Sequence, residues 1–182
     1  MKGKILMNVE KVFKSKHKNE IKQLYEAAFP KTERMPFPLM LIMSCLWHTE
    51  FLAYYDEDVL CGIAYMASLR KQTFIMFLAV DEKLRSKGYG SQILKEIQER
   101  AAANKVLVSI EPCDELAVNR VQREKRKQFY LRNGYAETGY MMKLSGQIQE
   151  ILIQSGEFNK RLFILFFMLY SCGTVIPKIW QK

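Results

Sequence analysis

A strand–helix–strand pattern near the middle of the chain constrains its fold more than any other feature. Residues 73–80, TFIMFLAV, form a continuous apolar run of strand length, which is typical of a strand buried on both faces. The apolar residues of 93–101 recur at helical spacing, and residues 106–110 form a second apolar strand. This order predicts a right-handed crossover between two parallel strands.

The remaining pattern predicts antiparallel strands joined by turns, with helices between them. The expected strands are 9–14, 51–55, 59–69, 140–144 and 148–153, and the expected further helices are 19–29, 39–47, 119–132 and 158–170. We therefore expect an α/β (α+β) fold with a central mixed, mostly antiparallel sheet of about seven strands flanked by helices. The length suits a single domain, 1–154, with a C-terminal helical extension, 155–182, packed on it.

The chain is basic, with 28 Lys and Arg against 19 Asp and Glu and a formal charge of +9. Such an excess favours an anionic partner, whether nucleic acid, a membrane surface or a phosphorylated small molecule. The most basic helix, 119–132, offers only Phe129 and Tyr130 for base stacking. We therefore expect no nucleic-acid partner.

Two further features bear on membranes, metals and compartment. The apolar run 162–170 is too short to span a bilayer, so it predicts a buried helix or the contact of a homodimer, with no membrane partner. Four cysteines, Cys45, Cys61, Cys113 and Cys172, form no CxxC pair, and two histidines lie far apart. We therefore expect no metal site, and a reducing, cytoplasmic location.

The segment Arg85–Ser91, RSKGYGS, follows the first buried strand and leads into the amphipathic helix. Gly88 and Gly90 allow backbone N–H groups to approach a ligand, and a helix N-terminus attracts phosphate. The segment lacks GxxxxGK[ST], and Ile93 replaces the third glycine of a dinucleotide fingerprint. The alternatives are a phosphate-binding turn of another class and a glycine-rich turn that merely starts a helix.

Two motifs resemble those of the GNAT superfamily, the GCN5-related N-acetyltransferases. Arg85, Gly88 and Gly90 form Arg-x-x-Gly-x-Gly after a strand that ends Phe-Leu-Ala-Val, which resembles motif A of the family. Residues 129–135, FYLRNGY, resemble its FYxxxGF segment. The order of elements also matches over residues 5–154, and residues 155–182 resemble the C-terminal extension of some bacterial members.

The resemblance implies acetyl-CoA as the cofactor and assigns it a binding segment. Backbone groups from Leu78 to Val80 would pair with the pantetheine arm, and the N–H groups of Ser86–Ser91 would hold the pyrophosphate near Arg85 and Lys87. The implied cofactor-binding residues are Leu78, Ala79, Val80, Arg85, Ser86, Lys87, Gly88, Tyr89, Gly90, Ser91, Arg123 and Arg126. Arg123 and Arg126 depart from the family pattern, and they could contact CoA phosphates or select an acidic acceptor.

The resemblance also implies catalytic roles. Tyr130 would be the general acid that protonates the departing thiolate, since a phenol of pKa about 10 is protonated at neutral pH. Glu111, after the second buried strand, is the candidate base, although a glutamate at a strand end is often only exposed. Without the first motif, Tyr130 would be read as core packing.

These observations predict an N-acetyltransferase that moves an acetyl group from acetyl-CoA to a small-molecule or peptide amine by direct attack. No cysteine has the setting of a nucleophile, so a covalent acyl-enzyme is not favoured. The alternative is a non-catalytic acyl-CoA-binding module or a basic nucleic-acid-binding module.

Overall fold

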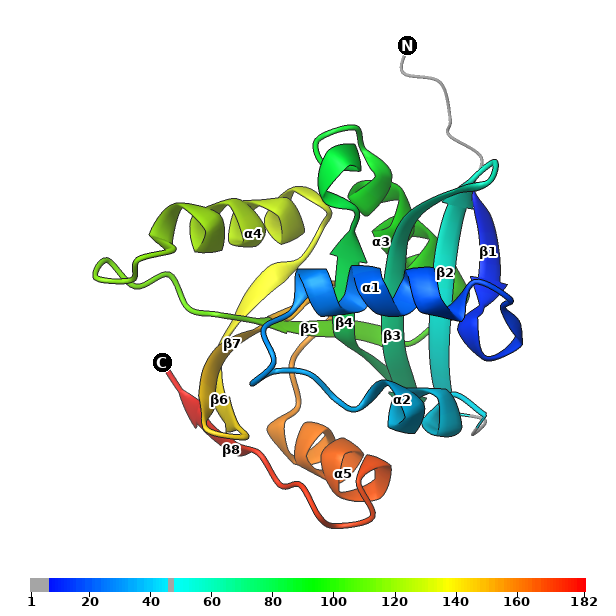
Figure 1. Cartoon of the computed structure of the whole chain (residues 1–182). Helices are drawn as coiled ribbons and strands as arrows, with labels where there is room; N and C mark the ends of the chain where they lie inside the picture. Colours follow the sequence, from blue (N-terminus) through cyan, green and yellow to red (C-terminus); the bar gives the residue numbers. More distant parts are fainter. Residues whose placement is uncertain (1–6, 46–47) are drawn as a thin grey trace. The chain divides into compact units, whose positions relative to one another are not determined.

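The computed structural model describes residues 7–45 and 48–182. Over these residues it contains eight strands in the order β1-β2-β3-β4-β5-β7-β6-β8, together with five α-helices and two short 3₁₀ helices (Figure 1). β4 and β5 are the parallel pair of this mixed sheet, so the predicted fold class is confirmed. The chain divides into two compact units, residues up to 67 with 75–100, and residues 68–74 with 101–182.

The first unit holds the N-terminal strands and the first three helices. Its elements are β1 (Asn8–Lys11), α1 (Lys18–Ala28), α2 (Phe37–Met43), β2 (Thr49–Asp56), most of β3 (Val59–Leu69) and of β4 (Gln72–Val80), and α3 (Tyr89–Ala101). β1 pairs antiparallel with β2, and β2 with β3. Figure 1 shows α1 lying across β2 and β3.

An aromatic cluster forms the core beneath α1. Tyr25 of α1 packs edge-on against Phe77 of β4, with ring centroids 5.2 Å apart. Phe37 of α2 packs against Phe51 of β2 at 5.6 Å. The Tyr25 hydroxyl also accepts a bond from the Met35 amide and donates one to its carbonyl, so the loop before α2 is fixed to α1. Burial of these rings explains why α1 and α2 form on this face.

Gly62 of β3 sets the approach of α3 to the sheet. A Cβ at this position would lie 2.6 Å from the Ala79 carbonyl oxygen and 2.7 Å from Ile93 Cδ1. Ile93 is fully buried on α3. Because Gly62 has no side chain, α3, the helix that follows the predicted phosphate-binding segment, can pack closely against the sheet.

The second unit is an antiparallel arrangement with the tip of the β3–β4 hairpin beside it. Its elements are β5 (Lys105–Ile110), α4 (Arg120–Arg132), β6 (Ala136–Leu144), β7 (Gln147–Ile153), α5 (Lys160–Tyr170) and β8 (Lys178–Gln181). β7 pairs with both β5 and β6, and β6 pairs with β8. The Lys105 amide donates to the Lys71 carbonyl over 3.0 Å, so β5 starts beside the hairpin turn.

α5 covers this hairpin tip with aromatic side chains. Phe163 and Phe167 lie with ring centroids 5.2 and 5.4 Å from that of Phe74, the third residue of β4. The apolar run in the C-terminal segment is therefore a packed helix. Over the described residues, no helix combines the length and apolar character needed to cross a membrane.

α4 is held on β7 by a buried ion pair. Glu150 of β7 is only 1% exposed, and its carboxylate receives Lys127 Nζ at 3.1 Å. Lys127 also pairs with Glu137 at 2.9 Å, and Lys182 reaches Glu150 at 3.4 Å. A buried carboxylate needs such partners, because removing a charge from water is costly. This network fixes the helix that carries Tyr130.

Several boundaries differ from the predictions. β1 ends at Lys11, where a 3₁₀ turn begins, and α1 starts at Lys18 after His17, not after Asn19. α2 covers Phe37–Met43, and the predicted helix end at Trp47 lies outside the described residues. The C-terminal segment contains an eighth strand, β8, in addition to its predicted helix. That strand is short and follows Pro177, so the sequence contains no hydrophobic pattern from which it could be predicted.

Candidate active site

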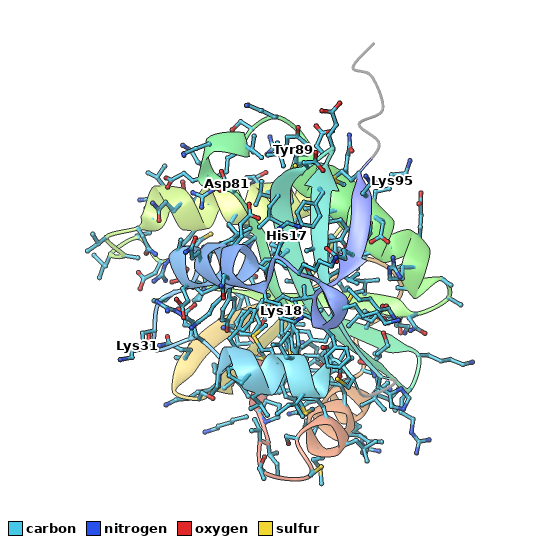
Figure 2. All side chains as sticks on the ribbon, turned by 45° about the vertical axis from the view of Figure 1, so that its right-hand side comes forward. His17, Lys18, Lys31, Asp81, Tyr89 and Lys95 are labelled. Carbon is cyan, nitrogen blue, oxygen red and sulfur yellow. The ribbon has the colours of Figure 1, made fainter. Side chains whose placement is uncertain are left out.

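The segment between β4 and α3 has the geometry of an anion-binding turn. A short 3₁₀ helix (Glu82–Leu84) follows β4, and its Asp81 cap accepts the Lys83 amide over 2.9 Å. Ser86 and Gly88 then adopt positive φ values of 64° and 98°. Asp81 and Tyr89 mark the two ends of this segment in Figure 2. Successive backbone N–H groups in such a turn form a concave donor surface.

The donors of this turn are available to a ligand. Within residues 7–45 and 48–182, the backbone N–H groups of Ser86–Ser91 have no protein acceptor, and the first helical bond runs from Gln92 to the Gly88 carbonyl over 3.2 Å. A Cβ at Gly88 would have no atom within 4 Å, so the space above the turn is open. These donors lie at the positive end of the thirteen-residue helix α3, which suits a pyrophosphate.

Charged side chains on the same turn complement these donors. Arg85 and Lys87 are exposed, and Arg85 pairs weakly with Glu82 at 3.9 Å. An exposed ion pair of this length contributes little to stability, so Arg85 can leave Glu82 and contact a phosphate at a small cost in free energy. The residues present therefore fit the phosphates of CoA.

Tyr89 fixes the turn to the rest of the first unit. Its hydroxyl donates to Asp56 Oδ2 at the end of β2 over 2.6 Å. The bond to the Asp56 carboxylate raises the pKa of Tyr89 to about 12, because loss of the phenol proton would remove it. Asp56 was not among the predicted site residues. It lies 33 residues from Tyr89, and no sequence signal joins the two.

Leu78, Ala79 and Val80, predicted to meet the pantetheine arm, are the last three residues of β4. The side chains of Leu78 and Val80 are half-buried and that of Ala79 is buried. The strand therefore leads directly into the donor-rich turn, and the predicted cofactor-binding residues from Leu78 to Ser91 lie on one continuous segment of the first unit.

Tyr130 lies in the second unit, on the last turn of α4. Its residue surface is 5% exposed, and its ring packs against Phe129 and Tyr135 with centroids 5.1 and 5.3 Å apart. Burial raises the pKa of Tyr130 to about 12, while the nearby charge of Arg126 acts in the opposite direction. The phenol is therefore fully protonated at neutral pH, as a proton donor must be.

The structure brings Glu111, Arg123 and Arg126 together in one ion-paired cluster. Arg123 Nη2 lies 3.1 Å from Glu111 Oε1, and Arg126 Nη1 donates to Glu111 Oε2 over 2.8 Å. Both oxygens of the candidate base therefore already receive a guanidinium. This arrangement favours a positioning role for Glu111, and its role as the base stays a prediction.

The two arginines differ in what they can still bind. Arg123 is 21% exposed and also donates from Nε to Asn119 Oδ1 and from Nη1 to the Pro112 carbonyl, so all three of its nitrogens are engaged. Arg126 is 49% exposed, and over the described residues Glu111 is its one recorded partner. Arg123 braces the loop before α4, while Arg126 keeps donors for an anionic ligand. Asn119, which sequence reasoning treated only as a helix start, is part of this brace.

The four cysteines differ in burial. Cys61 is fully buried on β3, and burial raises the pKa of its thiol, which opposes thiolate formation. Cys45, Cys113 and Cys172 are exposed. An exposed cysteine without an activating base is a weak nucleophile.

This fold and the donor-rich turn after β4 are what we expect of a transferase that uses an acyl-CoA. The model for the acetyltransferase (GNAT) domain matches residues 47–137, which is half of the chain. The chain therefore belongs to the GNAT acetyltransferase family. Its reaction is the transfer of an acetyl group from acetyl-CoA to an amine, with the acceptor not assigned.

Solved structures share the fold at low sequence identity. A putative GNAT acetyltransferase from Bacteroides thetaiotaomicron has a TM-score of 0.70 and 16% identity, over 92% of this chain and 97% of that one. An aminoglycoside 6'-N-acetyltransferase complexed with coenzyme A has a TM-score of 0.65 and 13% identity, over 85% and 99%. A Bacillus subtilis acetyltransferase in complex with CoA has a TM-score of 0.59 and 16% identity, over 83% and 99%. No curated protein matches the sequence.

Proposed function

We propose that the chain acetylates a small-molecule or peptide amine by direct attack of the amine on the thioester, with the turn at Ser86–Ser91 as its cofactor-binding site. The observation that carries the proposal is the run of unpaired N–H donors at the start of α3, opened by the positive φ of Gly88. Backbone donors there neutralise phosphate charge without a side chain having to reorganise. Arg85 and Lys87 supply full charges beside them.

We infer that Tyr130 supplies the proton to the leaving thiolate. A thiol of pKa about 8.5 leaves more readily when it is protonated as its bond breaks. With a pKa of about 12, the buried phenol keeps its proton over the whole physiological range. General acid catalysis of this kind typically contributes about 10²–10⁴-fold to the rate.

We infer that Glu111 and Arg123 position Arg126, which contacts an anion of the cofactor or of the acceptor. Three contacts support this role: the two ion pairs of Glu111 and the bond from Arg123 to Asn119. Guanidinium groups suit both a phosphate and a carboxylate, because they present two parallel donors. An acidic amine, such as an amino acid or an acidic peptide N-terminus, is therefore a class to test first.

Acetyl-CoA binding and acetyl transfer test the proposal separately. Acetyl-CoA at 100 times its Kd should stabilise the protein by about 2.7 kcal/mol, measured by thermal unfolding. CoA release should then be followed with polyamines, amino acids, aminoglycosides and peptides as acceptors. We include aminoglycosides and peptides because solved relatives by fold are an aminoglycoside 6'-N-acetyltransferase and a ribosomal-protein-S18-alanine N-acetyltransferase.

Tyr130→Phe should lower kcat by about 10²–10⁴-fold with the acetyl-CoA Kd within twofold of the original value. Tyr140→Phe is the matched control, because Tyr140 lies on β6 and packs against Phe158. An unchanged kcat in Tyr130→Phe would exclude the general-acid role. A protein that shows no stabilisation by millimolar acetyl-CoA would contradict the assigned binding turn.

A further inference from the structure

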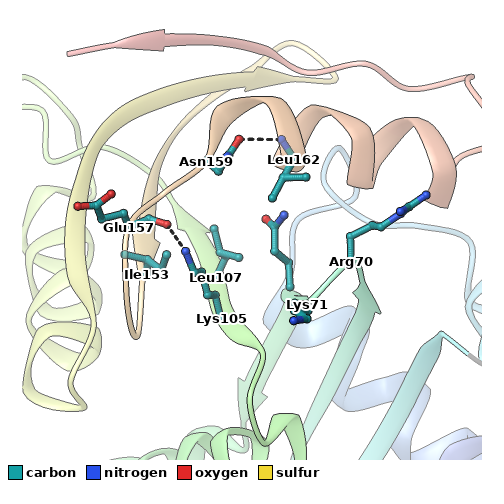
Figure 3. Close-up of a pocket in the computed structure, with 9 residues that line it drawn as sticks. Arg70, Lys71, Lys105, Leu107, Ile153, Glu157, Asn159 and Leu162 are labelled. Carbon is teal, nitrogen blue, oxygen red and sulfur yellow. Dashed lines mark hydrogen bonds between the residues drawn. The ribbon is translucent and has the colours of Figure 1, made fainter.

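A cavity of about 240 Å³ lies in the second unit, apart from the residues assigned to acetyl transfer (Figure 3). It is bounded by the hairpin turn before β4, the start of β5, the end of β7 and the start of α5. Its principal lining residues are Arg70, Lys71, Gln72, Lys105, Leu107 and Ile153. Gln72 begins β4, whereas the cofactor-binding turn follows the other end of that strand at Val80.

The floor of the cavity is apolar. Leu107 of β5 and Ile153 of β7 are register partners in the antiparallel pair, and both are buried. Leu162 of α5 adds a third aliphatic side chain. A dry cavity of about 150 Å³ lined by such groups can hold a benzene ring, so this one has room for a short hydrocarbon body.

A buried polar group without a partner lines the same cavity. Gln72 is 4% exposed, and within the part of the chain that the structure describes its Nε2 has no hydrogen-bond acceptor. Most buried polar atoms in folded proteins are paired, so an orphaned amide N–H calls for an acceptor that the protein itself does not provide. Gln72 is also one of the residues that line the cavity, so a molecule bound there is the candidate acceptor.

The charge around the cavity specifies the kind of acceptor. Arg70, Lys71 and Lys105 line it, against one acid, Glu157. Lys105 Nζ donates to the main-chain carbonyl of Glu157 over 2.8 Å, as the dashed line in Figure 3 shows, so its positive charge is not cancelled there. These cations make the entrance positive and exclude an amine.

The start of α5 adds to this positive field. Asn159 caps the helix by accepting the Leu162 amide over 3.1 Å, and both residues line the cavity. The first turn of an eleven-residue helix carries partial positive charge from its unpaired N–H groups. The start of α5, the three cationic side chains and the Gln72 amide all favour an anionic partner with a hydrogen-bond acceptor.

We propose that this cavity binds a small organic anion with an apolar body, its charged head at Gln72 and the surrounding cations and its body on Leu107, Ile153 and Leu162. A short-chain carboxylate is the simplest molecule with both features. The site shares no residue with the predicted cofactor-binding and catalytic sets.

Calorimetric titration of the full chain with hexanoate tests the proposal. Hexylamine, which has the same apolar body but a positive charge, tests the role of charge, and acetate, which lacks that body, tests the role of the apolar contacts. We expect hexanoate to bind at least tenfold more tightly than either, and to shift the Gln72 side-chain amide signals in NMR spectra. Gln72→Leu should weaken hexanoate at least tenfold, and Lys71→Gln severalfold. Lys143→Gln, an exposed cation on β6, is the charge-matched control and should leave the affinity unchanged.

Three results would overturn the proposal. Equal affinity for hexanoate and hexylamine would show that the cations select nothing. Unchanged affinity in Gln72→Leu, or unmoved Gln72 signals in the original chain, would show that the orphaned amide is satisfied by water. Loss of hexanoate binding on addition of acetyl-CoA would place the anion in the cofactor-binding turn.

Discussion

The hydroxyl of Tyr89 donates to the carboxylate of Asp56 over 2.6 Å, and this bond ties the first residue of α3 to the end of β2. The N–H donors of the predicted cofactor-binding turn run from Ser86 to Ser91 and include that of Tyr89, so the bond fixes their direction before a ligand arrives. Tyr89→Phe should therefore raise the KM for acetyl-CoA about three- to tenfold while kcat changes less than twofold. Steady-state kinetics at varied acetyl-CoA check this, and Asp56→Asn should have a similar effect. An unchanged KM in both variants would show that the turn holds its shape without the bond.

Glu111 offers a test between two roles. If it positions Arg126, Glu111→Gln should raise KM for acetyl-CoA or the acceptor and leave the shape of the pH–rate profile unchanged. If it is the base, kcat should fall about 10²–10⁴-fold and the profile should lose a limb. The ion pairs at 2.8 and 3.1 Å lead us to expect the first result.

Gly62 should be intolerant of any side chain. Gly62→Ala places a methyl group 2.6 Å from the Ala79 carbonyl oxygen and 2.7 Å from Ile93 Cδ1, so either β4 or α3 must move. We expect the free energy of unfolding to fall by about 1–3 kcal/mol, measured in urea. Adding Ile93→Val should restore part of this, because it relieves the side-chain clash but not the carbonyl one. If the double variant recovers the full free energy of unfolding, the contact with the Ala79 carbonyl oxygen does not contribute to the destabilisation.

Lys127→Met should destabilise the second unit. Glu150 is 1% exposed and would lose its nearest cation, although Lys182 remains within 3.4 Å. A buried carboxylate left with one distant partner costs about 3 kcal/mol in chemical unfolding. Lys125→Met, at an exposed position of the same helix, is the control. Equal stability of the two variants would contradict the structural role of this ion pair.

Stability should fall between pH 10 and pH 12. The pKa values of Tyr25 and Tyr130 are both raised to about 12, chiefly by burial, and that of Tyr54 is raised as well. The unfolded chain releases these protons near pH 10, so in this range the folded state binds more protons and loses stability as pH rises. The slope is about 1.4 kcal/mol per pH unit for each tyrosine. Denaturant unfolding at each pH checks this, and Tyr130→Phe should make the slope smaller.

The local parts of the fold could be predicted from the sequence. The buried run of β4, the amphipathic pattern of α3 and the turn between them are each determined by neighbouring residues. The two motifs that resemble those of the family then predicted the cofactor, acetyl-CoA. The start of α1 at Lys18, after His17, was not predicted, because Asn19 is the better capping residue by type.

Long-range partners could not be predicted. Nothing in the sequence joins Tyr89 to Asp56, or both arginines of α4 to Glu111, because these contacts depend on the register of strands and helices. The orphaned amide of Gln72 was equally hidden, since a glutamine beside Arg70 and Lys71 looks like an ordinary hairpin residue. The sequence shows which groups are available, and packing decides which of them meet.

β8 closes one side of β6, with Tyr140 opposite Gln181 and Lys143 opposite Lys178. The Lys182 amide extends this pairing to the Gly139 carbonyl over 2.8 Å. A version shortened after α5 would leave β6 with a row of unsatisfied main-chain groups, which is a template for joining a strand of another molecule. β8 therefore covers an edge of β6 that would otherwise be open to pairing with a strand of another molecule.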